Sequence, residues 1–231
     1  MADLEQMKEN ADKLLFCLEK LASFASSIHP TFGFVSPLIR VARTGLTDEK
    51  VYALDKNFQK IHTKLKSISQ KNQQCLRQIH ISEVNEIFGM YEEYEEHIKH
   101  QYDAFNEMVR KMKKDPDQTE HYMKTFQTVY ETNKSDISLD VYYRGVLGTG
   151  SLFGKPLLKV YLENCDGDRE IMEHRCSYIA HLFYMGFIVL GGYTTVTKDD
   201  EDAVREKWDK RVKEIQEKMQ EVLSQCRDRT A

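Results

Sequence analysis

Two heptad repeats that follow one another along the chain constrain its fold more than any other feature. In the first, which follows Thr47, apolar side chains alternate at three- and four-residue steps: Val51, Leu54, Phe58, Ile61, Leu65 and Ile68. The second follows Ser82, and its members are Val84, Ile87, Tyr91, Tyr94, Ile98, Tyr102, Phe105, Val109 and Met112. This spacing is typical of helices packed lengthwise against other helices. We therefore predict long helices over 47–81 and 82–112 that pair as an antiparallel hairpin. One very long helix with a bend near Ser82 is the alternative.

The rest of the chain also has helical patterns. Helices are predicted over 4–24, from Pro116 to Asn133, and over 137–147, 157–164 and 169–196. A charged helix is predicted after residue 197, with one apolar face formed by Val204, Trp208, Val212, Ile215, Met219 and Val222. No strand-like alternation and no internal repeat is present. The sequence therefore predicts an all-α fold, an elongated helical bundle.

We expect the 231 residues to form a single helical domain. Residues 1–46 would hold a helix and an apolar segment rich in proline and glycine. Residues 47–133 would hold the long helices, and residues 134–231 a glycine loop, an apolar helix and the charged C-terminal helix.

Charge and cysteine content exclude several classes of protein. The net charge is −4, so no basic surface predicts binding to nucleic acid. The five cysteines are an odd number, widely scattered and without a Cys-x-x-Cys pair, which favours free thiols in a reducing compartment. The N-terminus does not have the pattern of a secretory signal. We expect a cytoplasmic protein.

A glycine-rich stretch, Gly145 to Pro156, raises the question of a nucleotide site. A Walker-type loop would need glycine at position 149, which is Thr149, and a hydroxyl residue at position 156, which is Pro156. A dinucleotide fingerprint would need glycine at position 153, which is Phe153. We therefore interpret the stretch as a connection between two helices, with Pro156 opening the second one.

Two groups of residues could in principle bind a metal. His97 and His100 lie among four glutamates on one predicted helix, but no second Glu-x-x-His copy exists, so a solvated charged face is expected. Cys165, His174, Cys176 and His181 do not have the spacing of zinc ligands. No nucleophile motif is present either. We expect no catalytic, cofactor-binding or metal-binding residues and no cofactor, and we expect that the protein is not an enzyme.

Two apolar segments, 28–42 and 178–196, are the remaining functional candidates. The second is 19 residues long and contains no Asp, Glu, Lys or Arg, which reaches the ~20-residue length of a membrane span. A helix that is hydrophobic all round is also typical of the core of a helical protein. The sequence leaves both alternatives open, and with them membrane association through 178–196.

Three features of the second half resemble the rapunzel family of fish proteins. They are a Gly-x-Leu-Phe-Gly-Lys-Pro loop at 150–156, an apolar helix from Cys176 to Gly186, and Trp208 within a charged helix. The resemblance extends over nearly the whole chain and includes the apolar segment before the first heptad repeat. It implies a single helical unit, a family hinge at Gly148, Gly150 and Gly154, and a link to development, because the family is named for a fin and skeletal overgrowth phenotype. The family is also similar to cephalotoxin-like proteins, which implies a distant kinship with helical membrane-active toxins.

These observations support two hypotheses of function. The first is a non-enzymatic helical protein that acts in fin and skeletal development through a protein partner or a membrane surface. The second is a membrane-inserting, pore-former-like protein whose apolar segments leave the bundle. An enzyme of unrecognised type is a third alternative. The sequence does not identify a partner, and oligomerisation is compatible with the heptad repeats.

Overall fold

The computed structural model describes residues 82–133, 137–149, 154–197 and 201–227, together with the single positions 67 and 70. The elements are α4 (Ser82–Lys114), the short 3-10 helix η2 (Pro116–Gln118), α5 (Thr119–Thr132), α6 (Ile137–Leu147), α7 (Leu157–Asn164), α8 (Arg169–Thr197) and α9 (Glu201–Ser224). No strand forms in these ranges, where the β geometry present is an isolated bridge between Asp168 and Arg227. The predicted all-α fold is confirmed.

The second heptad repeat forms α4, and five of its apolar side chains face the interior. Ile87, Tyr91, Ile98 and Tyr102 are all buried, and Phe105 is 9% exposed. Apart from positions 67 and 70, the predicted helix 47–81 lies outside the described residues, and so do the hairpin that it would form with 82–112 and the N-terminal helix 4–24. These three features stay predictions.

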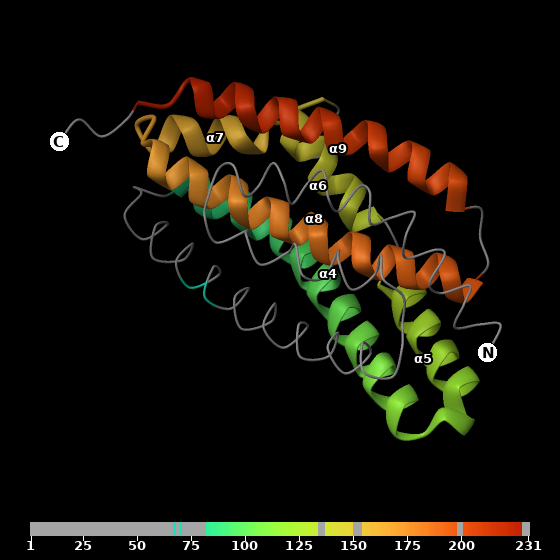
Figure 1. Ribbon diagram of the computed structural model, residues 1–231. Coiled ribbons are helices and arrows are strands. Elements are labelled where there is room, and N and C mark those ends of the chain that lie inside the picture. The colour runs from blue at the N-terminus through green and yellow to red at the C-terminus, as the bar shows by residue number, and fades with distance from the viewer. Residues whose placement is uncertain are drawn as a thin grey trace.

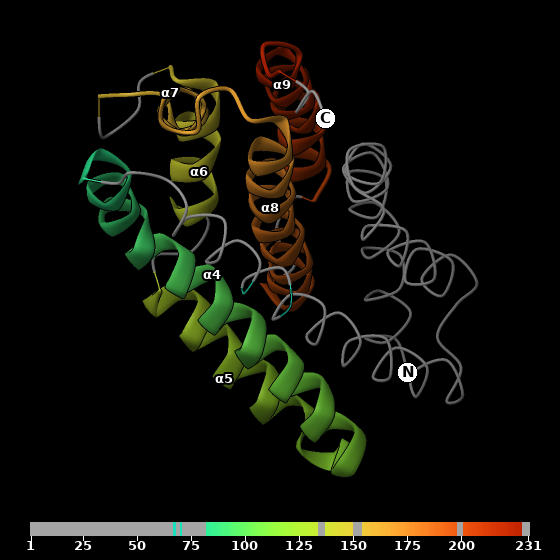
Figure 2. The same ribbon diagram turned by 90° about the vertical axis from the view of Figure 1, so that its left-hand side faces the viewer.

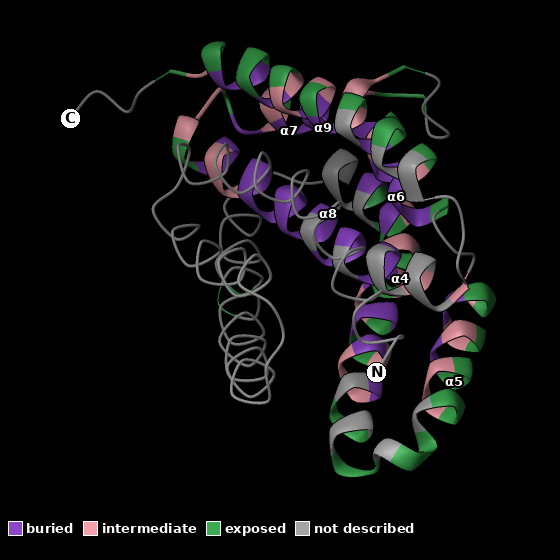
Figure 3. Ribbon diagram, turned by 45° about the vertical axis from the view of Figure 1, so that its right-hand side comes forward, coloured by how far each residue is buried: buried purple, intermediate pink, exposed green. Residues whose placement is uncertain are grey.

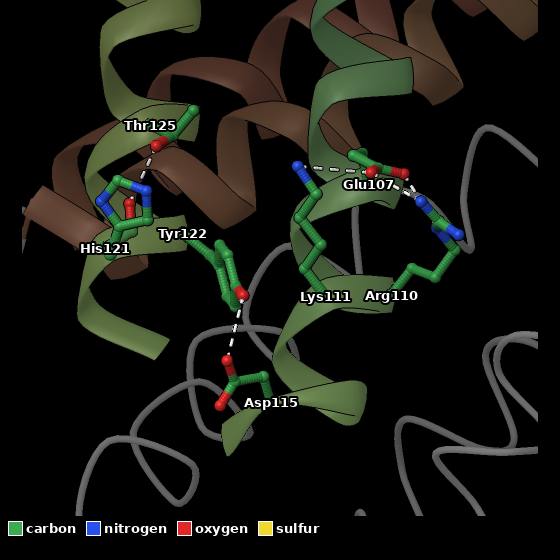
Figure 4. A network of polar contacts seen from close by, with 7 residues as sticks. All are labelled: Glu107, Arg110, Lys111, Asp115, His121, Tyr122 and Thr125. Atoms are coloured by element: carbon green, nitrogen blue, oxygen red, sulfur yellow. Dashed lines mark hydrogen bonds and ion pairs between the residues drawn. The ribbon is translucent and has the colours of Figure 1, made fainter. Parts of the chain in front are cut away.

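Within the described residues, helix α4 pairs with α5, which returns along it after a tight turn (Figure 2). The turn lies before Pro116, whose ring disfavours helical geometry in the preceding residue. At this end of the pair, Glu107 accepts hydrogen bonds from Arg110, and Tyr122 donates one to Asp115 at 3.5 Å (Figure 4). These contacts are exposed, so each is expected to contribute less than about 1 kcal/mol. The apolar side chains between the helices, rather than these ion pairs, hold α4 and α5 together.

Helix α8 is the centre of the described structure (Figure 1). It contacts each of the other described α-helices: α4, α5, α6, α7 and α9. Its described side chains from Ile179 to Leu190 are buried, so most of this stretch of the ribbon is purple in Figure 3. A helix that is apolar on all sides needs partners on all sides. The burial of α8 therefore agrees with the core alternative for 178–190.

Helix α9 covers one side of this centre with the apolar face that the sequence predicts. Trp208, Val212, Ile215, Met219 and Val222 are buried, and Val204 is partly buried. The Trp208 ring packs against Phe187 of α8, with ring centroids 5.1 Å apart, and against Tyr143 of α6 at 6.3 Å. Aromatic pairs at such distances contribute about 0.5–1.5 kcal/mol beyond the burial of their surface. Trp208 thus joins three helices at one point.

Candidate functional site

A buried arginine lies at the junction of α7 and α8. Arg175, in the second turn of α8, is only 3% exposed, although a guanidinium is costly to remove from water. Its Nη2 donates a hydrogen bond of 2.6 Å to the hydroxyl of Tyr161 in α7. The guanidinium carbon also lies 4.0 Å from the ring centroid of Tyr161 and 5.5 Å from that of Tyr178. Two electron-rich ring faces and a phenol oxygen therefore replace part of its hydration.

A glutamate supplies the opposite charge from α4. The hydroxyl of Tyr178 donates a short hydrogen bond to Glu95 Oε1, and the hydroxyl of Tyr142 in α6 lies 3.5 Å from Oε2. Lys99, one turn further along α4, places its Nζ 2.7 Å from Oε1. Residues from α4, α6, α7 and α8 thus meet in one polar cluster inside a mostly apolar core. We call Glu95, Tyr142, Tyr161, Arg175 and Tyr178 the arginine–tyrosine cluster.

Burial sets the protonation of the phenols. Burial raises the pKa of Tyr142 well above its usual value, and the negative charge of Glu95 adds to this effect. Burial also raises the pKa of Tyr161, although the Arg175 charge partly opposes the change. The neighbouring Tyr91, whose ring centroid is 5.2 Å from that of Tyr142, has a pKa raised to about 12, first by burial and then by Tyr161. At neutral pH these phenols are therefore protonated hydrogen-bond donors.

The cluster has the geometry of a structural site. The Arg175 side chain is too deeply buried to present a surface to a ligand, and the hydrogen bonds of Arg175 and Glu95 run between helices. Buried polar groups of this kind penalise any packing that separates them, because each partner would be left unpaired. The cluster therefore fixes the register of α8 against α4 and α7.

Outside this cluster, α6 and α9 are joined by a second set of polar contacts. Asp140 lies 2.8 Å from Arg211 of α9 and 2.8 Å from Arg144 of its own helix. The hydroxyl of Tyr143 donates a 2.5 Å hydrogen bond to Glu214, and the guanidinium of Arg211 lies 4.3 Å from the Tyr143 ring centroid. Burial, followed by the hydrogen bond to Glu214, raises the pKa of Tyr143 to about 12. These contacts fix α9 against α6 beside Trp208.

The glycine stretch forms a tight connection between α6 and α7. Gly148 has φ +73°, and its N–H donates a 2.8 Å hydrogen bond to the Arg144 carbonyl, as in a left-handed helix cap. A Cβ at Gly148 would lie 2.7 Å from the ring of Pro156, so the two ends of the connection are in contact. Pro156 is the N-cap of α7, as predicted. Residues 150–153 lie outside the described residues, and the family hinge stays a prediction.

The residues considered as metal ligands do not form a site within the described ranges. There, no three His, Cys, Asp or Glu side chains converge in an arrangement that could hold a metal ion. His97 Nε2 lies 4.0 Å from Glu93 of its own helix, and His100 is exposed. His181 is buried in α8 and its Nδ1 lies 3.1 Å from the Ser177 carbonyl oxygen.

Of the two apolar segments singled out in the sequence, one belongs to the described residues. Segment 28–42 lies outside the described residues. Segment 178–196 belongs to α8, and its described side chains from Tyr178 to Leu190 are buried. Among the helices of the described ranges, none combines the length and the hydropathy that a membrane span requires.

These observations define an all-α protein whose apolar central helix is tied to its neighbours by buried polar groups. A family model described as the cephalotoxin-like middle helical domain matches residues 46–231, and the chain belongs to this family. Among known proteins, Protein rapunzel of the zebrafish Danio rerio is 36% identical over 225 residues, which cover 97% of this chain and 96% of the relative. The resemblance to rapunzel is confirmed. No solved structure matches the chain.

Sequence reasoning did not single out the arginine–tyrosine cluster. One signal was present: Arg175 lies three residues after Met172 and four before Ile179, so all three share one helix face. Both apolar neighbours are fully buried. An arginine on the same helix face as apolar residues lies either at the edge of that face or within it as a buried charge. Only the packing of α7, which carries Tyr161, distinguishes the two.

Proposed function

We propose that this chain is a non-enzymatic helical protein that acts inside the cell by binding a protein partner, in the fin and skeletal development that its family resemblance implies. The developmental part rests on the resemblance to rapunzel and on the identity to the zebrafish relative. The biochemical part rests on how the most apolar helix is used.

The engagement of α8 is the observation that carries the proposal. Its buried run contacts other helices along its length, and Phe187 and Trp208 are each 0% exposed. Side chains that are buried between helices in this way stabilise the fold and are not exposed to a bilayer. The exposed side of α9 is charged instead: Glu206, Lys210, Lys213, Glu217 and Glu221. A rigid helical core with a charged exterior supports an interaction protein in the cytoplasm.

A membrane-inserting function is the alternative. It is favoured by the composition of α8, which has no Asp, Glu, Lys or Arg from Cys176 to Thr197. Insertion would require α8 to leave the core, and this would separate Tyr178 from Glu95 and Arg175 from Tyr161. Each separation leaves a buried polar group without its hydrogen-bond partner, which costs about 1–3 kcal/mol. The arginine–tyrosine cluster therefore opposes insertion.

Trp208 allows the two candidates to be distinguished in the intact chain. It is the single tryptophan, and it contacts α8 through Phe187. The full chain would be mixed with vesicles whose acyl chains carry bromine, which quenches tryptophan only by contact within the bilayer. We expect unchanged emission and no flotation with the vesicles. Quenching by brominated but not by ordinary vesicles, together with flotation, would favour insertion instead.

A matched pair of variants sharpens this test. Tyr178→Phe removes the hydroxyl that ties α8 to Glu95, whereas Tyr122→Phe removes a hydroxyl from an exposed contact on α5. If α8 stays in the protein core, both variants should remain in the fraction that does not float with the vesicles. If α8 is released onto membranes, Tyr178→Phe should float more than Tyr122→Phe.

The proposed role in fin and skeletal development has to be tested in an animal. Expression of the intact chain in zebrafish fin tissue is expected to alter fin growth, and the Trp208→Ala variant, which loses a core anchor, is expected not to. Fins that grow normally with abundant intact protein would contradict the developmental proposal, and leave the vesicle result unaffected.

A further inference from the structure

Three cysteines from separate helices are brought to one end of the molecule. Cys165 caps the C-terminal end of α7, Cys176 lies in α8, and Cys226 follows the end of α9. All three are free thiols; Cys165 and Cys176 are buried, and Cys226 is partly exposed. The helical pattern of the sequence gives no reason for this convergence.

The backbone brings the segments that carry two of these cysteines into contact. The residues after α9 run parallel to the turn between α7 and α8, where Arg227 pairs with Asp168. Arg227 N donates a 2.8 Å hydrogen bond to the Gly167 carbonyl, and Arg169 N donates one of 3.3 Å to the Arg227 carbonyl. Cys226 therefore precedes the paired residue on one strand of this contact, and Cys165 opens the turn on the other. We call residues 165–168 and 225–227 the C-terminal clasp.

The turn that carries Cys165 is compact. Asp168 N donates a 2.9 Å hydrogen bond to the Cys165 carbonyl, and the Cys165 thiol lies 3.9 Å from the Asp168 carbonyl oxygen. The same thiol also lies 3.6 Å from the Leu162 carbonyl oxygen, so it is located between the end of α7 and the residue that pairs with Arg227. The Cys226 thiol lies 3.5 Å from the Val222 carbonyl oxygen, at the end of α9.

The electrostatics agree with thiols that are close together. Burial raises the pKa of the Cys226 thiol to about 11, and the next cause is the Cys165 thiol. Burial raises the pKa of Cys176 to about 12, and the next cause is Cys226. Cys176 is 0% exposed and lies inside α8, whereas Cys165 lies in the turn that Arg227 contacts. Cys165 is therefore the better placed partner for Cys226.

We propose that Cys165 and Cys226 form a reversible disulfide that locks the C-terminal clasp and with it the end of α9 against the α7–α8 turn. A low-molecular-weight disulfide such as oxidised glutathione supplies the oxidising equivalents. The Cys226 thiolate attacks one of its sulfurs and expels a thiolate; the Cys165 thiolate then attacks Cys226 Sγ and expels the second. Two protein thiols lose two protons and two electrons, and one glutathione disulfide becomes two glutathione thiols.

The raised pKa of Cys226 makes this clasp slow to oxidise at neutral pH. Only a small fraction of the thiol is ionised there, and the thiolate is the attacking form. The rate of reaction with oxidised glutathione is therefore expected to rise about tenfold per pH unit between pH 7 and pH 9. Such a clasp responds to sustained rather than brief oxidation.

The experiment compares the oxidised and the reduced full chain. After incubation with oxidised glutathione at pH 9, non-reducing peptide mapping should give a linked peptide pair that contains Cys165 and Cys226 of the same molecule. The melting temperature should rise by on the order of 5 °C or more, because the bond closes a loop of about 60 residues in the unfolded chain. Adding a thiol reductant should reverse both changes.

Variants identify the two cysteines that form the bond. Each variant is compared with its own reduced form, so that the effect of the substitution on stability does not enter the comparison. Cys226→Ser should lose the linked peptides and the shift in melting temperature, and Cys226 is partly exposed, so this variant should fold. Cys176→Ala should keep both effects even if its melting temperature is lower. A linked Cys176–Cys226 pair, a shift that survives Cys226→Ser, or thiols that stay reduced in the folded chain would overturn the proposal.

Discussion

Two glycines in different helices are expected to respond differently to substitution by alanine. Gly186 lies in α8, where a Cβ would overlap Leu139 of α6: it would collide with Cδ2 and lie 2.9 Å from Cγ. Leu139 is itself buried at 3% exposure, so it has little room to move. Gly89 lies on the exposed side of α4, and a Cβ there meets nothing within 4 Å.

The magnitudes follow from two effects. In either helix, alanine in place of glycine gains about 1 kcal/mol of helix propensity. At Gly186 the added methyl must also be accommodated in a packed interior, which costs about 1–3 kcal/mol. Gly89→Ala is therefore expected to raise the free energy of unfolding by about 1 kcal/mol. Gly186→Ala should lie about 1–3 kcal/mol below it, because the propensity gain is common to both variants.

The assay is urea unfolding followed by far-UV circular dichroism, with the dependence on urea compared to show that the unfolded states are alike. A second comparison provides a rescue: in a Leu139→Ala background, which removes the obstructing side chain, Gly186→Ala should no longer be destabilising. If Gly186→Ala in the natural chain stabilises as much as Gly89→Ala, then α6 and α8 are not in close contact and the packing of Leu139 against Gly186 is refuted.

Three further perturbations test the core. Trp208→Ala should lower the free energy of unfolding by about 3–5 kcal/mol through the cavity it leaves, whereas Lys210→Ala on the exposed side of α9 should change it by less than about 0.5 kcal/mol; denaturant unfolding measures both. Tyr161→Phe keeps the ring over Arg175 but removes its hydrogen-bond acceptor, so a loss of about 1–3 kcal/mol is expected, and an unchanged stability would refute the pairing. Folding raises the pKa values of Tyr142 and Tyr161, so their full contribution to the free energy of unfolding is present below about pH 10. This contribution is lost as pH rises above about 10, because the phenols of the unfolded chain ionise first. Stability should then fall by up to about 3 kcal/mol per pH unit, with phenol ionisation at 295 nm coinciding with unfolding; ionisation of all tyrosines before unfolding would contradict this.

Helix positions could be predicted from the sequence because they depend on local periodicity. The helices predicted at 137–147 and 157–164 have those bounds in the structure, and the apolar face of α9 that contains Trp208 is buried as expected. In these segments the spacing of apolar residues and the turn residues between them indicate the same boundaries. The structure adds which helices these faces contact.

The arginine–tyrosine cluster and the C-terminal clasp could not be predicted in this way. Tyr161 and Arg175 are 14 residues apart on different helices, and Glu95 reaches Tyr178 across 83 positions. Periodicity assigns Tyr178 to an apolar helix but carries no information on which carboxylate it meets. Likewise, Cys226 follows the last helix, and its approach to Cys165 depends on how α9 lies across α7. Long-range polar contacts are set by tertiary packing, which one sequence does not specify directly.

The most direct measurement is amide hydrogen exchange of the intact chain, read by mass spectrometry with and without lipid vesicles. If α8 is the centre of a helical core, the amides of 178–190 should exchange among the slowest in the chain and more slowly than those of the exposed turn at 114–118. Vesicles should leave this protection unchanged. Exchange in α8 as fast as in that turn, or protection that moves from its neighbours α4 and α9 to α8 alone when vesicles are added, would contradict the central role of α8 in the core.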